Sequence, residues 1–282
     1  MARPVVGLAI LAGVAVSLDW TVVMQMLSNI SKFWLLIALL LAILGNLLCA
    51  LRWASISFSL GIGETVSRFL TLYGQGIAIN SVIPGGVIGG DAWRASQLSK
   101  AVPIRTRVRS VFLDRLSGLW SLSLLGLLGF LLVGFESLAL ASFPRPWFHA
   151  YLFGLMAIGC IPLLYKLGGV KANGLSLASQ AATILAFWSC MQAVGAAISV
   201  GEMLLVSLAI FLVAMVPASV GGFGVREGAS VVFMSFFGVS AESATLGSIL
   251  FGFAALIQGL LAILIWSSPQ FQHDPSTNNP AN

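Results

Sequence analysis

The chain has 282 residues, of which 59% are hydrophobic and only 8% are charged, and its mean hydropathy is +1.01. Soluble domains carry roughly 25% charged residues, so this composition excludes an ordinary soluble protein. The net charge of +5 is explained by basic cytoplasmic loops, and we expect no nucleic-acid partner.

The first apolar stretch runs from Val5 to Val16 and follows Arg3. Its match to a signal-peptide cleavage site is poor and further apolar runs follow, so we expect a short first transmembrane helix. This helix ends at Asp19. The stretch from Asp19 to Lys32 is predicted to lie at the membrane interface, with Trp20 as an anchor.

Five further runs are long enough to span, because about 20 apolar residues cross a hydrocarbon core of about 30 Å. With the first helix, they predict an all-α, polytopic helical membrane protein with about six full spans. The five runs are Phe33–Leu51, Leu116–Phe135, Trp147–Tyr165, Leu175–Val200 and Gly247–Trp266.

Two more apolar segments, Phe69–Gly90 and Met203–Val225, each carry a break rich in proline and glycine near the C-terminal end. Each segment either crosses the membrane or enters it and returns. Re-entry places Arg52 and Arg68 on the same cytoplasmic side as the basic stretch Arg94–Arg109. We therefore favour re-entrant segments, with full crossing as the alternative.

The order of spans and breaks then repeats. Residues 1–135 contain two spans, a broken segment and a span, and residues 147–266 contain the same series. Opposite orientations of the two halves would form an inverted repeat, whose paired breaks are typical of a transporter's binding site. We treat residues 1–266 as one transmembrane domain and residues 267–282, rich in polar residues and proline, as a disordered tail.

The first break, VIPGGVIGGDAWR, combines a proline with glycines, an acid and a base. Pro84 ends a helix, and Gly89 and Gly90 let another group approach the backbone. A helix that restarts near Asp91 points its free N–H groups into the gap, and Arg94 reaches back toward a phosphate or carboxylate. The alternative is that Arg94 lies among the lipid headgroups.

The second break, VPASVGGFGVREG, repeats these features. One interpretation is that its glycines serve helix packing alone. The segment between Glu227 and Glu242 is too short to span, so Arg226 and Glu227 are expected inside the bilayer, where charged residues usually have a function. The candidate site residues here are Pro217, Ser219, Gly221, Gly222, Gly224, Arg226 and Glu227.

Asp114 and Arg115 form a third charged pair, in the stretch SVFLDRLSGL. Adjacent helix residues do not face each other, so each is expected to find another partner, and we expect Asp114 to pair with Arg94. The alternative places both residues at the inner rim of the membrane. Asn80 is a polar residue in an apolar segment and is expected to bond between helices or to line a path.

The stretches NSVIPGGVIGGDAWRA, SVFLDRLSGL and VPASVGGFGVREGA resemble the signature stretches of the lysylphosphatidylglycerol synthase transmembrane region family, the flippase-like module of the multiple peptide resistance factor. The resemblance runs from Phe33 to Trp266 and implies a lipid-translocating domain without the soluble synthase domain. One departure is Gly86-Val87-Ile88, where the family often has a basic or polar residue. The motif residues carried over by position are Asn80, Pro84, Gly89, Gly90, Asp91, Arg94, Asp114, Arg115, Pro217, Gly221, Gly222, Gly224, Arg226 and Glu227.

The leading hypothesis is a flippase or transporter of the cytoplasmic membrane that moves an anionic amphipathic lipid, a phospholipid or a polyprenyl-phosphate-linked sugar. In this hypothesis Arg94 and Arg226 hold the phosphate at one midplane site, and Asp91 and Glu227 balance these arginines when the site is empty. The alternative is a non-transporting partner subunit of a lipid-synthesising or lipid-modifying enzyme.

An intramembrane enzyme is disfavoured, because both histidines lie outside the broken segments and an acid–base site usually needs histidine or paired carboxylates. The three cysteines are widely spaced and match no metal motif, so we expect them to be buried apolar residues. We therefore expect no enzymatic activity, no metal and no cofactor.

Overall fold

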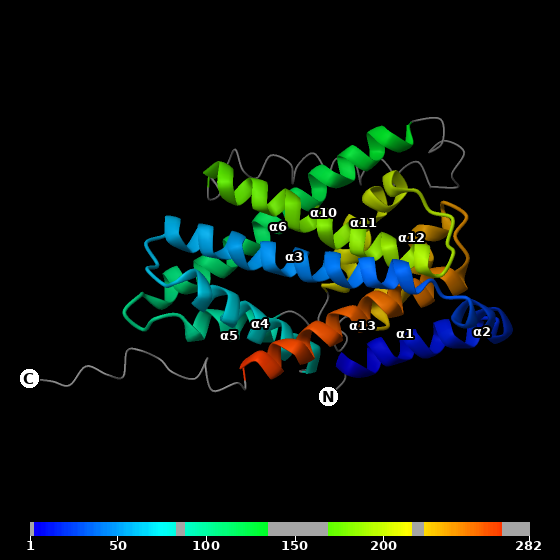
Figure 1. Cartoon of the computed structure of the whole chain (residues 1–282), viewed down its shortest axis with the longest axis horizontal. Helices are drawn as coiled ribbons and strands as arrows, with labels where there is room; N and C mark the ends of the chain where they lie inside the picture. Colours follow the sequence, from blue (N-terminus) through cyan, green and yellow to red (C-terminus); the bar gives the residue numbers. More distant parts are fainter. Residues whose placement is uncertain (1–2, 83–87, 135–168, 216–222, 267–282) are drawn as a thin grey trace, which may run out of the picture.

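A computed structural model describes residues 3–82, 88–134, 169–215 and 223–266 (Figure 1), and all regular structure within these ranges is α-helical. The all-α prediction is therefore confirmed, while the predicted tail lies outside the described residues. In chain order the helices are α1 (Arg3–Ser17), α2 (Trp20–Ser28), α3 (Lys32–Ser59), α4 (Val66–Val82), α5 (Ile88–Gln97), α6 (Ile104–Val133), α10 (Gly169–Ala193), α11 (Val200–Ala214), α12 (Val225–Ser235) and α13 (Ala241–Trp266).

Four of these helices, α3, α6, α10 and α13, are long and apolar enough to cross a membrane. The two longest, α3 and α6, contain 28 and 30 residues. At 1.5 Å per residue they measure about 42 and 45 Å, more than a hydrocarbon core of about 30 Å. These helices confirm a polytopic helical membrane protein. The predicted span Trp147–Tyr165 lies outside the described residues.

The helix boundaries differ from the predicted spans at several places. α6 begins directly after Pro103 rather than near Leu116. α10 ends before Val200, because Gly195 adopts a positive φ of 74° that a right-handed helix does not accept. The basic loop predicted from Arg94 to Arg109 is reduced to residues 98–103, since α5 and α6 take up the rest.

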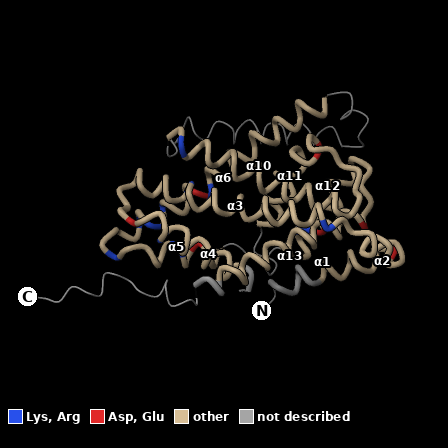
Figure 2. Tube along the Cα trace, viewed as in Figure 1, with Lys and Arg blue, Asp and Glu red and all other residues tan. Residues whose placement is uncertain are grey.

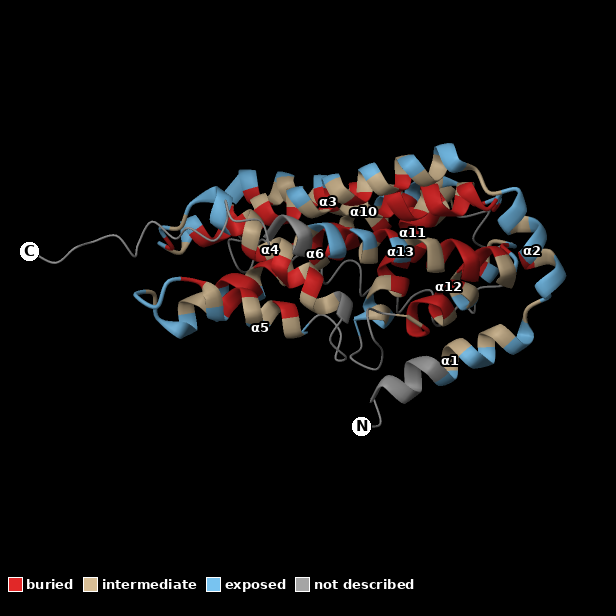
Figure 3. Cartoon of the chain, turned by 60° about the horizontal axis from the view of Figure 1, so that its bottom comes forward, coloured by how far each residue is buried: buried red, intermediate tan, exposed pale blue. Residues whose placement is uncertain are grey.

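The N-terminal region bends sharply between α1 and α2, by 91°. Asp19 makes the bend favourable, because its carboxylate accepts a hydrogen bond from the Thr21 backbone N–H at 2.9 Å and caps α2. Figure 3 shows that α1 and α2 present mostly exposed or half-buried surface, and Trp20 is 53% exposed. The stretch predicted to follow a short first helix is therefore a second short helix at a right angle to it.

The buried core has two parts, which appear in red in Figure 3. The larger part packs α10, α11, α12 and α13 together and contains the stacked rings of Phe187 and Phe251, whose centroids lie 4.9 Å apart. The smaller part surrounds Trp53 of α3, whose ring meets that of Phe69 edge-on at 4.8 Å. The smaller core joins α3, α4, α5 and α6, the helices that carry the first break and its surroundings.

The first broken segment forms an antiparallel hairpin of α4 and α5. Near the break, the Gly90 N–H of α5 donates to Asn80 Oδ1 of α4 at 2.8 Å. At the other end, Arg68 Nη2 donates to the Gln97 carbonyl at 3.4 Å. The chain thus returns along α5 to the end of the molecule from which α4 starts. Residues 83–87, which include Pro84, lie outside the described residues.

Small residues allow α6 and α11 to pack closely. A Cβ built on Gly129 would lie 2.6 Å from both the Gly201 carbonyl oxygen and the Leu205 backbone nitrogen. These are backbone atoms of another helix, so a side chain at this position would force the two helices apart. Close backbone approach at small residues is the usual way in which helices associate in membranes.

Replacing Gly129 with alanine is therefore expected to lower the melting temperature of the detergent-purified protein, because overpacking costs about 1–3 kcal/mol. Tryptophan fluorescence during heating measures the transition. Gly174→Ala on α10 is the matched control, since a Cβ there meets nothing within 4 Å. An unchanged melting temperature for Gly129→Ala would contradict the close packing of α6 and α11.

Candidate functional site

Charged residues are sparse along the helices, as the colours in Figure 2 show, yet some of them are buried. A charge inside a membrane costs about 2.5–3.5 kcal/mol on insertion scales, so buried charges are paired and usually mark a functional pathway. Among the residues that the structure describes, the fully buried charged ones fall into two groups. They are Arg52, Arg94 and Asp114 in the first group, and Arg226 and Glu227 in the second.

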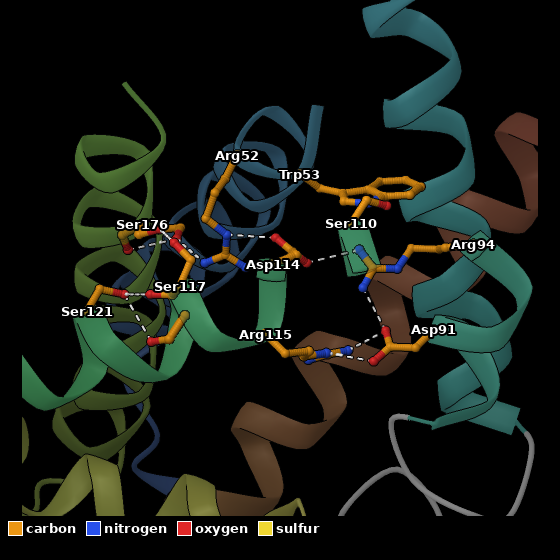
Figure 4. A network of polar contacts seen from close by, with 12 residues as sticks. Arg52, Trp53, Asp91, Arg94, Ser110, Asp114, Arg115, Ser117, Ser121 and Ser176 are labelled. Atoms are coloured by element: carbon orange, nitrogen blue, oxygen red, sulfur yellow. Dashed lines mark hydrogen bonds and ion pairs between the residues drawn. The ribbon is translucent and has the colours of Figure 1, made fainter. Parts of the chain in front are cut away.

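We call the first group, with its neighbours Asp91 and Arg115, the five-residue cluster (Figure 4). At its centre lies the Asp114 carboxylate of α6, whose side chain is 1% exposed. One carboxylate oxygen accepts from Arg52 Nε of α3 at 2.8 Å, and the other from Arg94 Nη1 of α5 at 3.3 Å. The predicted pair of Arg94 and Asp114 is confirmed. Arg94 is only 2% exposed, so its guanidinium is enclosed by the protein.

Asp91 forms the more exposed side of the cluster. Its carboxylate accepts from Arg94 Nη2 at 2.6 Å, and from Arg115 Nη2 and Nε at 2.7 Å each. The contact with Arg115 is therefore bidentate, the strongest geometry for such a pair. The side chains of Asp91 and Arg115 are 20% and 33% exposed, so a ligand can approach the cluster here. As predicted, the neighbours Asp114 and Arg115 pair with different partners.

Two aromatic rings contact the Arg94 guanidinium, whose carbon lies 4.8 Å from the Trp53 ring centroid and 4.6 Å from that of Tyr73. Such cation–π contacts are strongest where water is excluded. Trp53 is itself oriented by a hydrogen bond from its indole N–H to Ser110 Oγ at 3.2 Å. The position of Arg94 thus depends on α3, α4 and α6 together.

Glycines bring α4 and α5 close enough to build the cluster. A Cβ on Gly90 would lie 2.7 Å from Asn80 Oδ1, and one on Gly76 would lie 3.2 Å from Arg94 Cγ. The group that approaches the Gly90 backbone is therefore the Asn80 amide, which also satisfies an N–H of the first turn of α5. Glycine at the first break serves this close contact between the two arms of the hairpin.

The second group lies at the N-terminus of α12. Arg226 donates to Glu227 at 2.8 Å and to Ser248 Oγ of α13 at 3.0 Å, and Ser248 in turn donates to Glu227 at 3.0 Å. The other oxygen of Glu227 accepts from the Gly224 N–H. Arg226 and Glu227 are adjacent in sequence and pair with each other, whereas the adjacent residues Asp114 and Arg115 do not.

Two aromatic rings also lie close to Arg226. The rings of Phe223 and Phe251 lie 5.3 and 5.6 Å from its guanidinium carbon. Gly252 of α13 leaves room for this arrangement, because a Cβ there would lie 2.7 Å from the Phe223 ring. Like Arg94, Arg226 is held by a carboxylate and two aromatic rings.

An apolar pocket of about 580 Å³ lies between α3, α4 and α13. Two of its lining residues, Asn46 and Gln258, bond to each other through their amides at 2.6 Å. Tyr73 also lines the pocket and contacts Arg94, so the pocket adjoins the five-residue cluster. Much of the remaining lining is aliphatic: Ile43, Leu47, Leu70, Ile77 and Leu261.

The structure groups the sequence-predicted site residues around two separate places. In the part of the chain that the structure describes, no hydrogen bond or ion pair joins the two groups, and Figure 1 shows α4 and α5 toward one end of the molecule with α11 and α12 toward the other. The first place contains Asn80, Gly89, Gly90, Asp91, Arg94, Asp114 and Arg115. The second contains Gly224, Arg226 and Glu227. Pro84, Pro217, Ser219, Gly221 and Gly222 lie outside the described residues.

Arg52 is a member of the cluster that the sequence analysis missed. The predicted span ends at Leu51, whereas α3 continues to Ser59 and buries Arg52 inside the protein. Arg52 also donates to Ser179 Oγ of α10 at 3.3 Å. The signal was a single arginine between two apolar stretches, which indicates a buried charge when the helix runs through it.

Cys49 and Cys190 are free and buried, as predicted. Cys160 and both histidines lie outside the described residues. Among the residues that the structure describes, no three His, Cys, Asp or Glu side chains are close enough to hold a metal ion.

Replacing Asp114 with asparagine is expected to destabilise the protein by about 3–5 kcal/mol, because two buried guanidinium groups lose their shared counterion. The shift in thermal melting of the purified protein measures this. The double variant Arg52→Gln with Asp114→Asn removes one charge of each sign and is expected to regain part of the lost stability. A double variant as unstable as the sum of both single variants would show that Arg52 and Asp114 are not coupled.

The family described as lysylphosphatidylglycerol synthase TM region matches residues 5–170 and 168–263. These ranges include both charge groups and the apolar pocket. No curated protein matches the chain significantly. Because the family match covers most of the chain, the protein belongs to the lysylphosphatidylglycerol synthase transmembrane region family.

Proposed function

We propose that this protein moves an anionic amphipathic lipid, a phospholipid or a polyprenyl-phosphate-linked sugar, across the cytoplasmic membrane. The observation that carries the proposal is the five-residue cluster, in which three guanidinium groups meet inside a bundle of apolar helices. Guanidinium groups bind phosphate oxygens in a planar, bidentate geometry. The proposal involves no catalytic step, no metal and no cofactor.

The pocket supports an amphipathic ligand. Its lining is mostly aliphatic and its volume of about 580 Å³ falls within the roughly 300–1,000 Å³ of small-molecule sites. Tyr73 lines the pocket and also contacts Arg94 of the cluster. A lipid whose head lies at the cluster therefore has an apolar space beside it for part of a hydrocarbon chain. The description of the family, the membrane region of a phospholipid-modifying synthase, agrees with a lipid ligand.

The two broken segments support movement of the ligand rather than static binding. α5 and α12 have 10 and 11 residues, about 15 and 17 Å, and are too short to cross a membrane alone. In our proposal, α4 with α5 and α11 with α12 are re-entrant segments that enter from opposite sides, related as an inverted repeat. Rocking of the two halves would then expose the lipid site to each side in turn.

Translocation of fluorescent phospholipids and of a polyprenyl-phosphate sugar analogue in proteoliposomes tests the function. We expect Arg94→Ala and Arg226→Ala to abolish translocation, because the first removes a guanidinium from the cluster and the second leaves Glu227 buried without its cation. Arg109→Ala, an exposed position on α6, is the matched control and should retain the wild-type rate. The size-exclusion profile of each variant verifies folding.

Translocation that survives both arginine substitutions would contradict the proposal. Failure of the wild-type protein to move any of these lipids would instead favour a non-transporting partner subunit of a lipid-synthesising enzyme. Co-purification of such an enzyme from the native membrane would then identify the partner.

Cysteine accessibility tests the re-entrant segments, in a variant without native cysteines. Gly63→Cys and Ala101→Cys lie before α4 and after α5, and we expect a membrane-impermeant maleimide to label both from the same side. Ala197→Cys and Ser235→Cys flank α11 and α12 in the same way, and we expect both to be labelled from the opposite side. Labelling of Gly63→Cys and Ala101→Cys from different sides would show that the first segment crosses, and labelling of both pairs from one side would exclude the inverted repeat.

A further inference from the structure

The two charge groups differ in net charge. The five-residue cluster contains three guanidinium groups and two carboxylates, so its formal charge is +1, whereas the pair of Arg226 and Glu227 is neutral. A buried charge without a counterion is strongly unfavourable. Among the described residues, the five-residue cluster therefore carries one positive charge that no carboxylate balances, and its most exposed member is Arg115.

The other carboxylates in the described residues are engaged elsewhere. Asp19 caps α2 and Glu202 caps α11. Glu64 accepts a hydrogen bond from the Ser99 N–H at 2.9 Å, and Glu242 accepts from the Asp19 N–H at 3.4 Å. Within the described part of the chain, no further carboxylate contributes to the cluster.

We propose that the missing counterion is the head of the lipid itself, a phosphodiester with one net negative charge and no compensating amine. This inference rests on the proposed function and specifies its substrate class. The protein then selects acidic lipids over zwitterionic lipids and over lipids whose head carries an added amino acid.

The anion binds at Arg115, on the accessible side of the cluster. The side chains of Arg52, Arg94 and Asp114 are almost completely buried, whereas those of Arg115 and Asp91 are partly exposed. Asp91 contacts Nε and Nη2 of Arg115, and Nη1 takes part in neither contact. A phosphodiester oxygen binds at Nη1, or both of its free oxygens replace Asp91 on the guanidinium fork.

Selectivity follows from the sign of the excess charge. A head with net charge −1 neutralises the cluster, while a zwitterionic head leaves the excess unchanged and a head of net charge +1 increases it. Charges close together in a partly buried site interact more strongly than in water, so this difference is large enough to discriminate between lipids. The neutral Arg226–Glu227 pair needs no counterion, and its contacts with Ser248 position α12 against α13.

Native mass spectrometry of the detergent-solubilised full chain, titrated with three lipids of identical acyl chains, tests the inference. The probes are phosphatidylglycerol with net charge −1, phosphatidylcholine with net charge 0, and the lysyl ester of phosphatidylglycerol with net charge +1. We expect phosphatidylglycerol to bind at least about tenfold more tightly than either of the others, a difference of about 1.4 kcal/mol. Equal or tighter binding of the lysyl ester would overturn the inference.

Three variants assign the preference to the cluster. Arg115→Gln is expected to bind the three lipids with similar affinity, whereas Arg115→Lys retains the charge and should retain most of the preference. Arg109→Gln removes an exposed charge from the same helix and should bind as the wild type does. A preference that persists in Arg115→Gln, with a melting temperature that confirms folding, would contradict binding at Arg115.

Two further comparisons separate this inference from related ideas. Glycerophosphoglycerol, the deacylated form of phosphatidylglycerol with the same phosphodiester and net charge −1, is expected to compete at least about tenfold more weakly than phosphatidylglycerol, and equal competition would exclude a lipid as the specific ligand. A wild-type protein that binds phosphatidylglycerol selectively but translocates nothing would overturn the proposed function alone. A wild-type protein that translocates the lysyl ester as fast as phosphatidylglycerol would overturn the charge selection alone.

Discussion

The Asp114 carboxylate between Arg52 and Arg94 is the interaction on which the rest of the site depends. In an apolar bundle a charge has no water to solvate it, so its partners must come from the protein. Here they come from three helices, and pairing them draws α3 and α5 onto α6 at one depth. Aliphatic side chains do not impose such a register, because lipid tails solvate them equally well.

The α4–α5 hairpin transmits this constraint to the neighbouring pocket. Arg94 is held by Asp114, by Asp91 and by the rings of Trp53 and Tyr73. Tyr73 also lines the apolar pocket beside α13. A shift of α5 that opens the charged contacts would therefore also move a wall of this pocket. In the proposed function, this connection would couple the head of the lipid to the space that holds its chain.

The two breaks are followed by similar residues, but these residues form different charge arrangements. At each one, a short helix begins after the break and carries an arginine that contacts two aromatic rings and a carboxylate. The second arrangement is closed, because Glu227 and Ser248 satisfy Arg226. The first gathers two additional arginines and only one additional carboxylate, which leaves a positive excess. Similar motifs thus provide one place with an excess positive charge and one that is neutral.

The amino-acid sequence by itself determined the membrane class, most of the spans within the described residues and the positions of both breaks, because hydropathy and the backbone chemistry of proline and glycine are local properties. It also predicted that Asp114 and Arg115 would pair with different partners, since adjacent helix residues point in different directions. Only the tertiary structure revealed that Arg52 belongs to the cluster and that three arginines share two carboxylates. These facts depend on which helix faces meet across 20 to 62 residues of sequence, and the pattern within one apolar helix contains almost no information about its partner.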